Sequence, residues 1–218
     1  ASDLAGIDGN MWATAVAGAG AVTRSTANAT PLMVTVSTVD AAGASTARLR
    51  TVVRLRARAG EFITGSGTAR FTPKRLSIAW EGRFTTITAF DNATFFMGLA
   101  SGTTEDRSST NNIGFVLSAD ALQTLTDSAG VETLTAVAGT AITLTNFNEY
   151  RIEVVQNAAA ANVEFFVNDE LRNTHTTNIP DINAFFQVFV DNDTTGTAVF
   201  DAGAVTAMYS DVDLGNFE

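Results

Sequence analysis

The fold of this chain is decided by the segment EYRIEVVQNAAAANVEFFVNDELRNTHTTNIP, residues 149–180. It contains three short runs with strand character, two of them rich in Val, Ile and Phe, separated by an Asn/Ala-rich loop and by the pair Asn168–Asp169. Alternation of apolar and polar residues with a period of two is typical of half-buried strands. Asn and Asp tolerate the backbone of tight turns. The segment therefore predicts a meander of three antiparallel strands.

Similar runs recur along most of the chain at a spacing of about ten residues. We predict strands at residues 32–39, 47–60, 75–80, 83–90, 94–100, 112–118, 122–127, 131–137, 150–156, 163–167, 170–176, 184–190, 197–201 and 205–210. Many short strands at regular spacing are typical of sandwiches and barrels, in which the 15 Phe residues would fill the core. The predicted fold class is all-β.

The chain has 218 residues, enough for one β-sandwich domain, which we place at residues 31–218. Residues 1–30 are rich in Ala, Gly, Thr and Asn and have no sustained period. They predict an N-terminal arm that is extended or becomes ordered against a partner, with a plain flexible tail as the alternative. A helix over residues 8–17 is weakly specified. No run approaches 18 apolar residues, so no transmembrane helix is expected.

Charge is distributed unevenly along the chain. The formal net charge is −10 and the isoelectric point about 4.5, which disfavours nucleic acid and anionic membranes as partners. Residues 48–83 carry nine basic side chains against two acids, a net +7, whereas residues 84–218 carry 18 acids against three arginines, a net −15. This asymmetry predicts that the basic part meets an acidic partner, such as a second copy of the chain.

Several stretches carry a resemblance to a known family. They are TFFMGLAS (94–101), NNIGFVLSAD (111–120), NEYRIEVVQN (148–157), VEFFVNDELRNTHTTNIP (163–180), FQVFVDND (186–193) and AVFDAGAVTAMYSD (198–211). In this order they resemble the concanavalin A-like, laminin G-like domains found in many phage structural proteins. The resemblance covers about residues 74–210 and implies an antiparallel two-sheet jelly-roll sandwich. The family includes lectins, glycanases and structural virion proteins, so the fold does not fix the function.

An arginine-rich strand is predicted within residues 47–60. Five arginines there share one parity, and the apolar residues take the other: Arg48, Arg50, Arg54, Arg56 and Arg58. Their guanidinium groups would pair with carboxylates of a capsid protein or a neighbouring subunit. The alternative is a solvated strand face paired with acids of the adjacent strand. Nucleic-acid binding is disfavoured because no aromatic residues interleave with the arginines.

Catalytic residues are hard to find in the sequence. There is no cysteine and no GxSxG motif, and the one histidine, His175, is expected at the surface. Glycanases of the family resemble one another in a Glu-x-Asp-x-(x)-Glu strand, which this chain lacks. Glu81, Glu149, Glu153 and Glu164 are interpreted as isolated strand acids. The chain is therefore predicted not to be an enzyme.

Four residues are candidates for a metal site and a sugar site. Asp191 and Asp193 offer oxygen ligands for calcium, the only cofactor considered, but an Asx-rich turn without metal is the favoured alternative. Trp80 and Tyr150 are the candidates for a glycan platform, although Trp80 lies in an alternating strand and fits the core or an edge better.

These observations predict a non-enzymatic phage virion structural protein. It would decorate the capsid or act as an accessory protein on the particle surface, dock through the arm and the arginine strand, and form a homo-oligomer. The alternative prediction is a lectin-like module that binds surface polysaccharide.

Overall fold

The computed structural model describes residues 12–24, 34–38, 45–51, 55–56, 75–88, 93–101, 111–118, 121–156, 161–180, 183–192 and 197–210. Within these ranges the regular elements are all strands. No helix that is long and apolar enough to cross a membrane occurs among the same residues.

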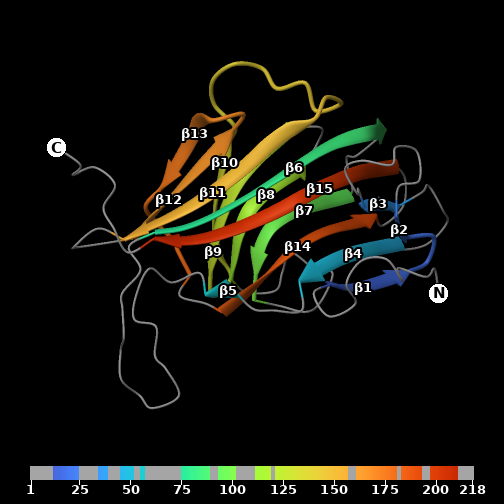
Figure 1. The fold of residues 1–218 in the computed structure, drawn as a ribbon, viewed down its shortest axis with the longest axis horizontal. Helices are drawn as coiled ribbons and strands as arrows, with labels where there is room; N and C mark the ends of the chain where they lie inside the picture. Colours follow the sequence, from blue (N-terminus) through green and yellow to red (C-terminus); the bar gives the residue numbers. More distant parts are fainter. Residues whose placement is uncertain are drawn as a thin grey trace, which may run out of the picture.

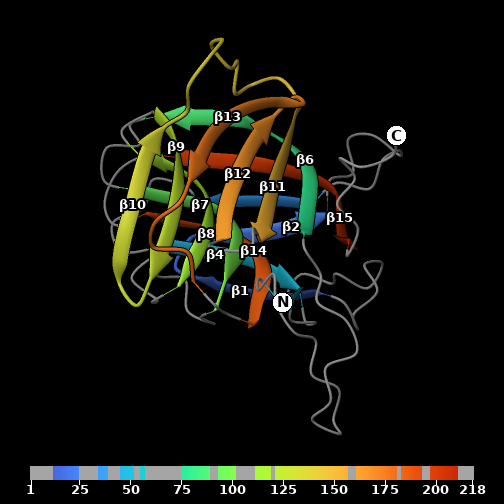
Figure 2. The ribbon, with the colours of Figure 1, turned by 90° about the vertical axis from the view of Figure 1, so that its left-hand side faces the viewer.

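The strands form two antiparallel sheets (Figure 1). The eight-stranded sheet has the order β1 (Trp12–Ala17), β4 (Ser45–Thr51), β14 (Asn183–Asn192), β7 (Ala93–Ala100), β8 (Asn112–Ser118), β9 (Ala121–Ser128) and β10 (Val131–Ala136), and β5 (Leu55–Arg56) pairs with β14. The seven-stranded sheet has the order β13 (Glu170–His175), β12 (Ala161–Val167), β11 (Asn148–Gln156), β6 (Arg75–Thr88), β15 (Thr197–Ser210), β3 (Val34–Thr38) and β2 (Ala21–Arg24). The prediction of an antiparallel two-sheet jelly-roll sandwich is confirmed. Figure 2 looks onto the side of the sandwich that carries β10, β11, β12 and β13.

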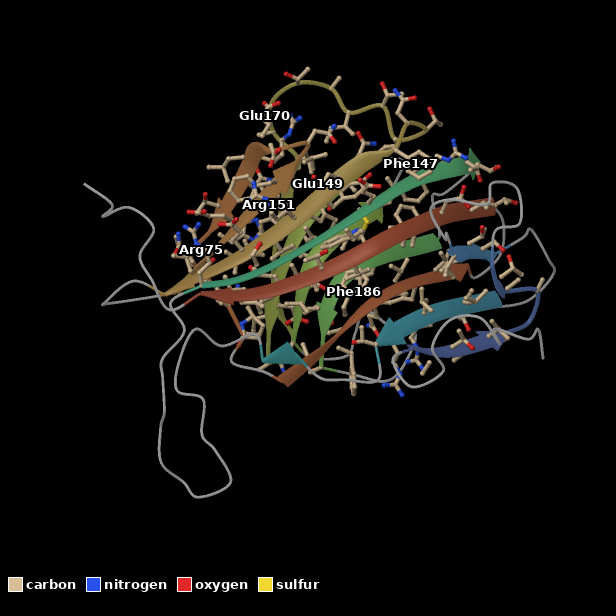
Figure 3. All side chains as sticks on the ribbon, viewed as in Figure 1. Arg75, Phe147, Glu149, Arg151, Glu170 and Phe186 are labelled. Carbon is tan, nitrogen blue, oxygen red and sulfur yellow. The ribbon has the colours of Figure 1, made fainter. Side chains whose placement is uncertain are left out.

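The core lies between the sheets and is built from alternate residues of the facing strands. Trp80 stacks on Tyr150 with ring centroids 6.0 Å apart, and the indole Nε1 donates to Met97 Sδ at 3.3 Å. Phe186 lies 5.0 Å from the Trp80 ring and is labelled in the interior of Figure 3. The predicted role of Phe as core filling is therefore confirmed for the buried phenylalanines that the structure describes.

The prediction of a separate N-terminal arm is corrected for the part of that region that the structure describes. β1 pairs with β4 at the edge of one sheet, and β2 pairs with β3 at the edge of the other. Residues 12–24 are extended, as expected, but the chain's own sheets order them rather than a partner. Residues 12–17 are also not helical, because their backbone groups are used in pairing with β4.

Two strands, β6 and β15, each join two runs that the sequence predicted as separate strands, and a third predicted strand is divided. β6 runs through Gly82, where a Cβ atom would lie 2.1 Å from the Phe200 ring, so this glycine serves packing and not a turn. β15 continues past an irregularity between Ala202 and Val205, where the sequence predicted a break between two strands. The strand predicted over residues 47–60 is observed as β4 and β5, with residues 52–54 and 57–60 outside the described part.

Candidate functional site

The predicted arginine face lies on the outer side of the eight-stranded sheet, away from the core. Arg48 is only 7% exposed, and the Arg50 guanidinium lies 4.6 Å over the Phe185 ring. Apolar side chains are buried on the same side, where Phe96 and Phe189 stack at 5.3 Å. Arg48 therefore offers almost no surface to a partner, contrary to the docking hypothesis. Arg54, Arg58 and the side chain of Arg56 lie outside the described residues.

The predicted sugar platform is not formed by Trp80 and Tyr150. Their exposed fractions are 1% and 0%, because their parity on β6 and β11 turns both rings into the core. Burial raises the pKa of the Tyr150 hydroxyl well above its ordinary value. The alternative reading of Trp80 as a core residue was correct, and both are replaced as candidates.

His175 is buried between the sheets, contrary to the expected surface position. Its Nδ1 lies 3.0 Å from Thr126 Oγ1, and its Nε2 lies 3.0 Å from Thr124 Oγ1. Thr126 Oγ1 also lies 3.0 Å from the Thr177 carbonyl and Thr124 Oγ1 lies 3.2 Å from the Thr135 carbonyl, so each hydroxyl has its one proton available to a carbonyl or to the imidazole. Burial lowers the pKa of the imidazole, which favours its neutral form. His175 thus joins β13 to β9 and has no catalytic geometry.

The calcium prediction remains a prediction. Asp193 and the side chain of Asp191 lie outside the described residues. Within the described part of the chain, no group of three or more His, Cys, Asp or Glu side chains could hold a metal ion.

The outer side of the seven-stranded sheet, which we call the polar face, carries the alternate residues of β6 and β11 that point away from the core. Figure 3 labels Phe147, Glu149, Arg151 and Arg75, which follow one another along these strands. Among the described residues, five large apolar side chains are exposed, and of these only Phe147 is aromatic, at 44%.

Phe147 belongs to a row of interacting side chains across the polar face. The Arg83 guanidinium carbon lies 4.5 Å from the centre of the Phe147 ring. Arg83 Nε lies 3.4 Å from Asp201 Oδ2, and Thr35 Oγ1 donates to Asp201 Oδ1 at 2.7 Å. The register places Arg83, Asp201 and Thr35 directly opposite one another on β6, β15 and β3. We call Phe147 with Arg83 the first aromatic contact.

The loop before β11 holds Phe147 in place. Asn148 Nδ2 donates to the carbonyls of Thr143 and Asn146 at 3.1 and 2.8 Å, and Phe84 N donates to Leu144 O at 2.9 Å. Arg172, which is 7% exposed, donates to two further carbonyls of the same loop at 3.1 and 2.9 Å. The first aromatic contact is therefore preorganised by a loop whose polar groups are satisfied from β6, β11 and β13.

A second aromatic contact lies farther along β11. The Arg151 guanidinium carbon is 4.0 Å from the centre of the Phe166 ring, which is directly opposite on β12. Arg151 also pairs with Glu153 and, at 3.2 Å, with Asp169 of the β12–β13 turn. Its guanidinium is thus fixed over the ring.

Two pairs of glutamates face each other on the polar face, and this corrects their interpretation as isolated acids. Glu81 is opposite Glu149, and Glu153 is opposite Glu164. Glu153 is neutralised by Arg75 at 3.0 Å and by Arg151. By contrast, Glu81 and Glu149, which we call the glutamate pair, have no cation partner in the described part of the chain. The strand parity of both residues was readable in the sequence, but their register was not.

No protein-family model and no curated protein sequence matches the chain. Solved structures are similar in fold. The carbohydrate recognition domain of Emp47p aligns over 93% of this chain and 89% of its own, with a TM-score of 0.59 and 5% identity. The metal-free carbohydrate recognition domain of Emp46p aligns over 90% and 87%, with a TM-score of 0.57 and 8% identity. The alginate lyase AlyC3, in complex with dimannuronate, aligns over 83% and 76%, with a TM-score of 0.51 and 10% identity.

These similarities establish a concanavalin A-like fold, as the resemblance in the sequence implied. The similar structures include both binding domains and enzymes, so the fold leaves the activity to the residues of the site.

Proposed function

We propose that this chain is a lectin-like, non-catalytic carbohydrate-binding domain whose ligand lies on the polar face. The observation that carries the proposal is the exposed Phe147 beside the fixed Arg83–Asp201 pair. A sugar ring has an apolar side of C–H groups that can pack on an aromatic ring, and hydroxyl groups that need donors and acceptors. The carbohydrate recognition domains among the similar structures agree with this class of ligand.

The polar groups around Phe147 suit hydroxyl recognition. Arg83 uses its Nε for Asp201, while its terminal nitrogens have no partner among the described residues. Asp201 is 6% exposed and receives both Thr35 and Arg83, so the guanidinium is held before a ligand arrives. A donor fixed in advance costs less conformational entropy on binding than a free side chain.

The glutamate pair raises hydrolysis as a second candidate function. Cross-strand Cβ atoms lie roughly 4.5–5.5 Å apart, but a retaining glycosidase needs a similar separation between the carboxyl groups themselves. The Glu81 Oε2 atom lies beside Gly203 of β15, on the side of β6 that is away from Glu149. In such a pair one carboxyl must stay protonated, which apolar surroundings or a closely placed second carboxylate shielded from water bring about. Glu81 is exposed and Glu149 is half-buried on an open polar surface, so we propose binding and not hydrolysis.

A place on a virus particle stays a prediction from the sequence, as do a capsid partner and a homo-oligomer. The buried Arg48 weakens the docking mechanism that the sequence suggested, because its guanidinium is not offered to a neighbour. A carbohydrate-binding domain is compatible with a place on a virus particle and with a place elsewhere.

A polysaccharide array tests the proposed function. The wild-type chain should bind at least one hydroxyl-rich polysaccharide, and Phe147→Ala should weaken binding tenfold or more. Val131→Ala is the matched control, since Val131 is 58% exposed but lies on β10 of the other sheet. Absence of binding to every polysaccharide, or equal binding by Phe147→Ala, would contradict the proposal. If the wild-type chain releases shortened sugars from a polysaccharide and Glu81→Gln does not, hydrolysis would be favoured instead.

A further inference from the structure

We propose that the polar face binds an internal segment of a linear, uncharged polysaccharide, which lies along β11 and spans both aromatic contacts with the glutamate pair between them. This inference rests on the proposed function and adds the length, direction and charge class of the ligand.

The spacing of the two aromatic contacts sets the length of the ligand. Phe147 precedes β11 directly, and Arg151, which lies over Phe166, is four residues farther along. Four residues of strand correspond to about 13 Å. One sugar ring is too small to reach both contacts, whereas a linear chain lying along the strand can pack on Phe147 and meet the Arg151 guanidinium that lies over Phe166. Figure 3 shows Phe147, Glu149 and Arg151 in this order.

The glutamate pair lies between the two contacts and is the least compensated feature of the face. Like charges directly opposite each other in a sheet destabilise the fold. The neighbouring pair, Glu153 and Glu164, occurs beside two arginines, which bind Glu153 and leave it 4% exposed. In the described part of the chain, no basic side chain forms an ion pair with Glu81 or Glu149. Local rules of stability are broken most often where a site needs the offending groups.

The chemistry of the pair selects hydroxyl groups and rejects anions. Ionised carboxylates only accept hydrogen bonds, and sugar hydroxyls donate them. A carboxylated or sulfated chain would place its charge beside two unpaired carboxylates, on a chain of net charge −10. The arginines cannot fully offset this repulsion, because Arg151 is already paired with Glu153 and Asp169, and Arg83 with Asp201.

Calorimetric titration with oligosaccharides of increasing length tests the length of the site. The probes are β-1,4-glucan, β-1,3-glucan and β-1,4-mannan oligosaccharides from one to eight sugars, with oligogalacturonate as the anionic counterpart. For a neutral series that binds, affinity should rise at least tenfold from the monosaccharide to the chain that spans both contacts. Phe147→Ala and Phe166→Ala should each flatten this rise, and melting curves would show that both variants are folded.

Charge selection is tested with the variant Glu81→Gln/Glu149→Gln. It should bind the neutral chain at least fivefold more weakly and bind oligogalacturonate more tightly than the wild type does. Glu164→Gln, the same change at another acid of the polar face, is the control and should alter neither affinity.

The outcomes separate the two proposals. If no probe binds, the proposed function fails together with the inference. If a monosaccharide binds as tightly as the longest chain, or if oligogalacturonate binds more tightly than every neutral chain, carbohydrate binding stands and the inference is overturned.

Discussion

Removing one charge from the glutamate pair should stabilise the fold while it weakens ligand binding. In Glu81→Gln the carboxylate opposite Glu149 becomes a neutral amide of nearly the same shape. The cross-strand repulsion disappears, and no ion pair of the described residues is broken. The substitution therefore isolates the electrostatic term of a single contact.

The magnitude follows from the position of the pair. Cross-strand pairs contribute about 0.2–1 kcal/mol, and because Glu81 is exposed the value should fall in the lower half of this range after solvent screening. For a domain of this size 1 kcal/mol shifts the melting temperature by about 2–4 °C, so the expected gain is about 0.5–2 °C. At about 1 M salt, where the Debye length is near 3 Å, the gain should vanish.

Urea denaturation at low salt measures the effect, with Glu149→Gln and the double variant completing a thermodynamic cycle. The coupling between positions 81 and 149 should be repulsive. Glu153→Gln is the contrasting variant and should lose about 1–2 kcal/mol, because Arg75 and Arg151 lose their shared partner. A loss of stability in Glu81→Gln, or a coupling of zero at low salt, would refute the reasoning.

Three other predictions concern stability alone. Burial lowers the pKa of His175 below its ordinary value of about 6.5, so on acidification the unfolded chain binds a proton before the folded chain does. The contribution of His175 to the free energy of unfolding is therefore fully present above pH 6.5. It should fall as the pH drops from 6.5 toward the pKa of the folded state. Urea titrations at several pH values would show this slope, and His175→Gln should remove it. Ala129 has φ of 55° in the β9–β10 turn, so Ala129→Gly should add about 0.5–1 kcal/mol in the same assay, and a loss would contradict the role of backbone strain. Trp80→Ala should cost about 3–5 kcal/mol, because the ring is 1% exposed and packs on Tyr150 and Phe186; thermal melting with less than 1 kcal/mol of loss would show that the core does not depend on it.

Most of the strands could be predicted because alternation is a local signal. The strand predicted over residues 112–118 coincides with β8, the one predicted over 94–100 differs from β7 by one residue, and the one predicted over 163–167 begins two residues after β12 does. The breaks within strands were not predictable in the same way. The sequence predicted a break at residues 81–82, and only the contact of Gly82 with Phe200, 118 positions away, shows why a continuous strand needs glycine there.

The candidate site depended on information that the sequence does not contain. The period-two pattern of the strand alone predicts that Trp80 and Glu81 lie on opposite faces, Trp80 toward the core and Glu81 toward solvent, and the structure agrees on both. That Glu81 faces Glu149 follows from the register of β6 against β11, which tertiary pairing sets. Phe147 lies in a loop between two predicted strands, where periodicity carries no signal about exposure.

The two faces of the sandwich differ in what their polar residues do for the fold. On the eight-stranded sheet Arg48 is nearly buried, beside an apolar cluster on the same side. On the polar face Arg75 and Arg151 stabilise Glu153, and removing any one of the three should cost stability. Glu81 and Glu149 differ from all of these residues, because we expect the fold to be more stable without one of their charges. The polysaccharide proposed above would use both carboxylates as adjacent acceptors, which gives this small destabilisation a function.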